Sequence, residues 1–185
     1  MVSLTDAVVI VTGGSTVSGR ELARALAGRG CAVVVVYLDD QRGAETAVDE
    51  IVGTNGTAIA VRADITDELD VERLFSETIA AFGGVDVIVH ADPGATRVVN
   101  QQAASQLRDG GAIVHVGTSD AVPPFLNNKL KARGITIAGP TPTPGRESSG
   151  ACPDLIHSDI TYCVAVLDRW RLRSDEKSRG STNWS

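Results

Sequence analysis

The chain has 185 residues, a length that suits one domain with one core. Its net charge of -6 argues against the basic face that nucleic acids require, and no stretch approaches the roughly 18 apolar residues of a membrane span. Residues 1–6 lack the charged and apolar parts of a signal peptide, and Cys31, Cys152 and Cys163 form no CxxC pair. We therefore expect reduced thiols and a cytoplasmic protein.

The first half of the chain alternates apolar runs with amphipathic segments. Continuous apolar runs are typical of strands covered on both faces, and apolar residues at helical spacing predict the helices between them. Gly28, Gly53 and Gly83 stop the three helices, and Thr66 or Asp67 caps the third. The predicted order is strand 7–11, helix through 22–27, strand 32–37, helix 41–51, strand 57–61 and helix to 82.

The second half continues the alternation. We predict strands at 85–89, 112–116 and 135–138, and helices at 97–108, 125–132 and 158–170. Residues 139–154 are rich in Pro, Gly, Ser and Thr and predict a mobile loop, and 171–185 a flexible polar tail. Right-handed crossovers then make an α/β fold, a three-layer doubly wound parallel sheet of about six strands, as one domain over residues 1–170.

A glycine-rich turn, 12–19, joins the first strand to the first helix. A dinucleotide's pyrophosphate meets a helix N-terminus at this place, and glycines let the backbone approach it. The turn resembles the TGxxxGxG turn of the short-chain dehydrogenase/reductase family. The resemblance implies cofactor contacts, and the branched Val17 at the middle glycine's position narrows the pyrophosphate site. The implied contacts are Thr12, Gly13, Ser15, Thr16 and Gly19.

Three further stretches are similar to the same family. Asp64-Ile65 resembles its adenine-contacting pair, 86–91 resembles the strand that leads to its NNAG motif, and 133–137 resembles its RGITV segment. We therefore identify the chain as a shortened, divergent member of a Rossmann-fold oxidoreductase family. The resemblance adds Asp64, Ile65 and Ala91 to the expected cofactor contacts.

The resemblance implies NADP or NAD as the cofactor and leaves the choice open. Tyr37 resembles family members whose next residue is an arginine that holds the 2′-phosphate of NADP, but here that residue is Leu38. Asp39 can accept a bond from a ribose hydroxyl and favours NAD, whereas Arg42 favours NADP. Both can equally be surface charges.

The family's proton donor is missing. Family members use a Tyr, a Lys four residues later, and a Ser at the end of the fifth strand. Thr118 falls at the serine's position, with Ser119 beside it, but the only tyrosines are Tyr37 and Tyr162. Val166 stands four residues after Tyr162, so we predict that the usual carbonyl/alcohol redox mechanism is absent.

Two family helices are also shortened or lost. Gly94 leads almost directly to the helix at Arg97, which removes the family's relay Asn, and Asn100 lies too close to the fifth strand to replace it. The lost helices form the family's four-helix oligomer contact. We expect a monomer or an atypical dimer in place of the usual tetramer.

Other residues can supply an acid and a base. His90, Asp92, Thr118 and Ser119 gather at the ends of the fourth and fifth strands, with His90 as a base that Asp92 orients. We expect His115 to be a satisfied core or semi-buried histidine, and we expect no metal site. Three functions stay open: an oxidoreductase with substitute acids, a non-redox tailoring enzyme (isomerase, cyclase or dehydratase) acting on a small-molecule substrate, and a non-catalytic remnant that binds a nucleotide or a partner.

Overall fold

The computed structural model describes residues 4–91, 96–116, 122–139 and 153–180, and in the last helix the side chains of 160–173. Six strands alternate with six helices in these ranges. The elements are β1 Val8–Thr12, α1 Val17–Ala27, β2 Ala32–Tyr37, α2 Gln41–Gly53, β3 Thr57–Arg62, α3 Glu68–Phe82, β4 Val87–His90, α4 Arg97–Gln106, β5 Ala112–His115, α5 Pro124–Ala132, β6 Thr136–Ala138 and α6 Pro153–Gly180.

The strands form one parallel sheet in the order β3-β2-β1-β4-β5-β6. The chain starts in the middle, builds outward to β3, and then crosses back to β4. This reversal is the switch point of a doubly wound fold, and the crevice at the carboxyl ends of the strands there is the usual ligand site. The predicted six-stranded Rossmann-type sheet is confirmed.

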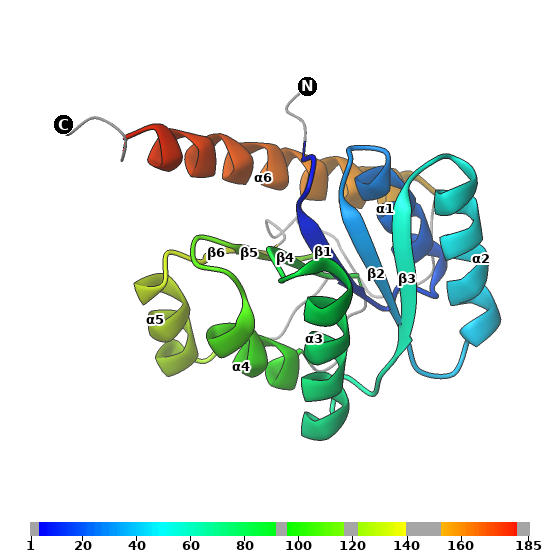
Figure 1. Ribbon diagram of the computed structural model, residues 1–185, viewed down its shortest axis with the longest axis horizontal. Coiled ribbons are helices and arrows are strands. Elements are labelled where there is room, and N and C mark those ends of the chain that lie inside the picture. Colours follow the sequence, from blue (N-terminus) through cyan, green and yellow to red (C-terminus); the bar gives the residue numbers. More distant parts are fainter. Residues whose placement is uncertain (1–3, 92–95, 117–121, 140–152, 181–185) are drawn as a thin grey trace.

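Helices cover both faces of the sheet (Figure 1). Side chains from α1, α2 and α6 pack with the residues of one strand face, including Val9, Val33 and Val87. Side chains from α3, α4 and α5 pack with the residues of the other face, including Ile10 and Val34. Because both faces are buried, the strands carry apolar residues without alternation, which explains why their sequence runs were continuous.

The last helix is longer than the sequence pattern predicts. We expected it at 158–170, but α6 runs over Pro153–Gly180. Residues 171–180 have no apolar periodicity, yet a helix that is anchored by packing at one end gains a hydrogen bond with each added residue. Most of the residue types in this extension, such as Arg, Lys and Glu, are good helix formers. Among the helices of the described ranges, none has both the length and the apolarity to cross a bilayer.

Helix α6 is fastened along the amino-terminal edge of the sheet. Leu167 is fully buried, and the Trp170 indole N–H donates to the Gly110 carbonyl at 2.6 Å. Asp168 pairs with Arg29, which lies in the turn before β2. Helix α6 therefore closes one face of the core and leaves the carboxyl edge of the strands to other elements.

Candidate functional site: a crevice at the carboxyl ends of β1, β2 and β3

In the glycine-rich turn between β1 and α1, the backbone at Gly13 and the backbone at Gly19 lie so close together that a Cβ would not fit between them. Gly13 has a φ of 66°, in the left-handed region that favours glycine. A Cβ on Gly19 would lie 2.1 Å from the Gly13 carbonyl oxygen, and a Cβ on Gly14 would lie 2.7 Å from a methyl carbon of Val35. A side chain at these positions would strain the turn, most severely at Gly19, where the Cβ would meet backbone.

Thr16 caps the first turn of α1. Its hydroxyl accepts a hydrogen bond from the Gly19 N–H at 3.1 Å and donates one to the Gly13 carbonyl at 2.8 Å. Val17 is the first helical residue, and it is 53% exposed. The N-terminus of α1, where backbone N–H groups attract anions, therefore faces the crevice with one valine side chain at its surface.

A cavity of about 220 Å³ opens beside this turn. Three segments line it: the turn itself, the end of β2, and the loop between β3 and α3. The volume is below the roughly 300–1,000 Å³ of pockets that enclose a whole ligand. It therefore suits one part of a dinucleotide, with the rest lying along the crevice. The lining residues are Gly13, Ser15, Thr16, Val36, Tyr37, Leu38, Ala63, Asp64, Ile65 and Thr66.

Seven of the predicted cofactor contacts line this cavity, and four do not. Thr12 is fully buried beneath the turn, and Gly19 lies within α1. Asp39 is exposed just beyond Leu38, and the Ala91 N–H donates to the Thr12 carbonyl at 3.2 Å. The structure thus brings the turn, the β2 end and the β3 end together, as the sequence predicted.

Asp64 presents an ionised carboxylate to the cavity. Its Oδ1 accepts bonds from the Thr66 hydroxyl at 2.6 Å and from the Thr66 N–H at 2.8 Å. These bonds, the hydroxyl's first, hold the pKa of Asp64 below its ordinary value. An ionised carboxylate only accepts hydrogen bonds, which suits the exocyclic amino group of adenine.

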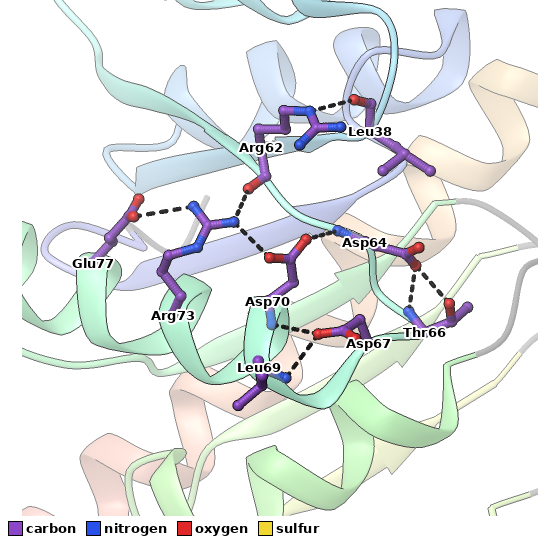
Figure 2. A network of polar contacts seen from close by, with 9 residues as sticks. All are labelled: Leu38, Arg62, Asp64, Thr66, Asp67, Leu69, Asp70, Arg73 and Glu77. Carbon is purple, nitrogen blue, oxygen red and sulfur yellow. Dashed lines mark hydrogen bonds and ion pairs between the residues drawn. The ribbon is translucent and has the colours of Figure 1, made fainter.

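A polar network ties the two walls of the cavity together (Figure 2). The Asp64 N–H donates to Asp70 Oδ2 at 2.9 Å, and Arg73 donates to Asp70 Oδ1 at 2.8 Å. Arg73 also donates to the Arg62 carbonyl at 3.0 Å, and Arg62 Nε donates to the Leu38 carbonyl at 3.1 Å. One chain of contacts therefore runs from the Asp64 wall to the Leu38 wall.

Thr12, His90 and His115 stand in register at the ends of β1, β4 and β5. His90 is 1% exposed; its Nδ1 lies 3.0 Å from the Thr12 hydroxyl and its Nε2 lies 3.0 Å from Asn100 Oδ1. Its ring stacks on His115 with centroids 4.7 Å apart. Burial, and secondarily the neighbouring His115, lowers the pKa of His90 to about 3.

The hydrogen bonds of His90 indicate a structural role for this side chain. Because the Asn100 oxygen can only accept, His90 carries its proton on Nε2, and Nδ1 accepts from Thr12. Both ring nitrogens are thus engaged inside the core, whereas the sequence suggested a general base at the crevice. Asn100, which the sequence set aside, supplies the bond that orients the ring. The other three predicted catalytic residues, Asp92, Thr118 and Ser119, lie outside the described residues.

His115 is buried in the core, as the sequence predicted, but the prediction that its ring nitrogens are satisfied there is wrong. It is 2% exposed, yet neither of its ring nitrogens has a hydrogen-bond partner in the part of the chain that the structure describes. Burial lowers its pKa, so the ring is neutral. In the same ranges, no three His, Cys, Asp or Glu side chains gather as a metal ion would require.

Sequence reasoning missed the network of Arg62, Asp70 and Arg73. One signal was present: Asp70, Arg73 and Glu77 follow each other at helical i,i+3 and i,i+4 spacing, and both ion pairs form. The link from Arg62 to Leu38 joins neighbouring strands across 24 positions, and no local pattern reports it.

A doubly wound parallel sheet whose order reverses between β1 and β4, with a glycine turn at the N-terminus of α1, places the molecule among the Rossmann-type nucleotide-binding folds. Residues 7–121 match the family model described as short chain dehydrogenase. This match covers more than half of the chain, which therefore belongs to the short chain dehydrogenase family.

Individual relatives agree with this membership. The chain is 44% identical over 87 residues to a hydroxynaphthalene reductase-like protein Arp2 of Metarhizium robertsii, a match that covers 47% of this chain and 33% of the relative. A crystal structure of a dehydrogenase/reductase from Sinorhizobium meliloti 1021 aligns with a TM-score of 0.64 and 27% identity, over 90% of this chain and 89% of that one. A short chain dehydrogenase from Burkholderia cenocepacia J2315 in complex with NADP aligns with a TM-score of 0.64 and 26% identity, over 90% and 92%.

The chain spans only part of the curated relatives that it matches. The aligned share of their length is 33% for the Metarhizium robertsii protein and 51% for its counterpart in Metarhizium brunneum.

Proposed function

We propose that the protein binds NADP or NAD through the adenosine half of its crevice and does not carry out the family's usual carbonyl/alcohol redox reaction. The observation that carries this proposal is the cavity whose walls come from the glycine-rich turn, the end of β2 and the β3–α3 loop. Its position at the carboxyl edge beside the N-terminus of α1 is where a dinucleotide binds in this kind of fold. The relative from Burkholderia cenocepacia, which was crystallised with NADP, supports the same ligand class.

The argument against the usual redox reaction rests on the tyrosines. Tyr37 lines the cofactor cavity, and the Tyr162 hydroxyl on α6 donates to the Gly139 carbonyl. Gln41 and Val166 stand four residues after them, so neither has the lysine that would lower its pKa. The stretch between β5 and β6, where the family resemblance places the pair, contains no tyrosine.

A non-redox tailoring enzyme is a weaker proposal on this geometry. It would need an acid and a base in the crevice, and His90 was the expected base. His90 is buried, has both nitrogens engaged and has a pKa of about 3, so it would take up a proton only in strong acid. A nucleotide-binding protein without chemistry of its own needs none of these groups.

Calorimetric titration with NADPH and with NADH tests the proposal. We expect micromolar binding of at least one of them, and no loss of the reduced nicotinamide's absorbance with a panel of ketones and aldehydes. Val17→Gly is the matched variant, because removal of the isopropyl group from the first turn of α1 lets the pyrophosphate approach the backbone N–H groups and should tighten binding several-fold. No binding at millimolar dinucleotide, by either form of the protein, would reject the proposal. Steady turnover of any carbonyl would reject its second part.

A further inference from the structure

An arginine that the sequence pattern did not assign contacts a residue that lines the cofactor cavity. The family resemblance expects the cation that holds a 2′-phosphate directly after Tyr37, where this chain has Leu38. Arg62 ends the neighbouring strand β3 and stands in register with Tyr37. Its Nε donates to the Leu38 carbonyl at 3.1 Å, so its guanidinium lies against the residue that occupies the expected position (Figure 2).

Both the backbone and the side chain of Arg62 are held by hydrogen bonds. Its carbonyl accepts a bond from Arg73 at 3.0 Å, and its side chain is fixed by Nε on Leu38. No ion pair engages Arg62 in the described ranges, whereas Arg24, Arg73 and Arg108 are all paired with carboxylates. The residue is exposed. Two of its neighbours line the cavity: Leu38, to which its Nε donates, and Ala63, which follows it in the chain.

The nearby carboxylates do not cancel this charge by contact. Asp40 is committed to α2, because its Oδ1 accepts the Gly43 N–H at 2.8 Å at the helix N-terminus. Asp39 is exposed and has no ion pair with Arg62 among the described residues. A guanidinium whose Nε is fixed, and whose terminal N–H groups have no partner in the part of the chain that the structure describes, matches a phosphate monoester, to which it can donate two parallel bonds.

We propose that Arg62 reads the 2′-phosphate of the bound cofactor, so that the cavity selects NADP over NAD. This inference rests on the proposed function and adds a specificity-determining residue to it. The family resemblance places the phosphate-binding arginine directly after β2, where this chain has Leu38. In this proposal Arg62, at the end of β3, takes over that role.

Two small adenosine ligands test the inference. Neither contains the nicotinamide or the pyrophosphate, so their binding does not depend on how closely a pyrophosphate can approach Val17. Titration with adenosine 2′,5′-bisphosphate and with 5′-AMP isolates the 2′-phosphate. We expect the wild-type protein to bind the bisphosphate about tenfold to a hundredfold more tightly, as a charge-assisted pair contributes. Arg62→Gln should abolish that preference, because it should weaken binding of the bisphosphate far more than binding of 5′-AMP, and Arg62→Lys should keep part of it.

Lys129→Gln on α5 is the matched control, because it removes one exposed positive charge from a helix that contributes no residue to the cavity lining, and it should change neither affinity. The preference for the bisphosphate should also shrink as the salt concentration is raised.

Equal affinities for the two ligands in the wild-type protein would overturn the inference and leave the proposed function standing. Loss of the preference in Arg42→Gln but not in Arg62→Gln would do the same. If neither adenosine ligand nor either dinucleotide binds, both the inference and the proposed function fail.

Discussion

Gly19 is the residue on which the cofactor turn depends. A Cβ at this position would lie 2.1 Å from the Gly13 carbonyl oxygen, and backbone cannot yield as a flexible side chain does. We expect Gly19→Ala to lower the free energy of unfolding by about 1–3 kcal/mol and to abolish dinucleotide binding. Urea denaturation and titration measure the two effects. Gly53→Ala is the control, because nothing lies within 4 Å of a Cβ there and alanine favours the helix. Equal behaviour of the two variants would contradict this account of the turn.

The buried histidine pair makes the fold sensitive to acid. Burial lowers the pKa of His115 and takes that of His90 to about 3, while the unfolded chain titrates near 6.5. Below pH 6.5 the unfolded chain therefore binds protons that the folded chain does not. Stability is complete above that pH and falls by up to about 1.4 kcal/mol per pH unit for each histidine, until the pH nears the folded-state pKa.

His115→Leu tests this dependence. The variant removes an imidazole that has no partner in the described residues, so it should raise stability at pH 8 and raise it further at pH 5. Urea unfolding at the two pH values gives the comparison. A stability gain that is the same at both pH values would mean that His115 does not resist protonation in the folded protein.

At the residue scale, the sequence located most of the adenosine cavity but not the contacts that hold it. Positions such as Asp64 and Leu38 follow strand ends, and strand ends are readable from apolar runs. The bonds that Arg62 and Asn100 make depend on which side chains meet across strands and helices. His115 was misjudged for the same reason, since burial could be read from its strand but partners could not.

At the scale of elements, α6 holds its face of the core through a few apolar side chains. Leu167 is fully buried beside Cys163, and Leu172 is 52% exposed on the same helix. We expect Leu167→Ala to cost about 2–5 kcal/mol of stability, as other buried leucines do, and Leu172→Ala to cost less than about 0.5 kcal/mol. Chemical denaturation of both variants measures the difference. Similar losses would show that α6 is not docked as described.

The strands were the most predictable elements and the last helix the least. Four strands, β1, β2, β4 and β5, are buried along most of their length, so each appears in the sequence as an apolar run. Each expected strand was found within two residues. The extension of α6 beyond Trp170 has no apolar face to reveal it. Its helical state follows from the packing of the preceding turns, which sequence periodicity does not report.

For the whole molecule, we propose that the family's four-helix oligomer does not form. The lost helical segments belong to the connections after β4 and β5, where α4 has ten residues and α5 has nine. Such helices are about 15 Å long and offer little surface for a four-helix contact. We expect sedimentation velocity to give a monomer or a dimer at micromolar concentration. A stable tetramer would contradict this proposal.

The contacts that anchor α6 also determine where a label can be attached to the protein without reaching the crevice. Asp168, Trp170 and Arg171 contact Arg29, Gly110 and Thr5, which precede β2, β5 and β1. The later turns of α6 therefore leave the molecule from the edge opposite the cofactor crevice, and the chain enters at the same edge (Figure 1). A fluorophore attached to the last turns of α6, before Gly180, would therefore stand away from the crevice and should not disturb ligand titrations.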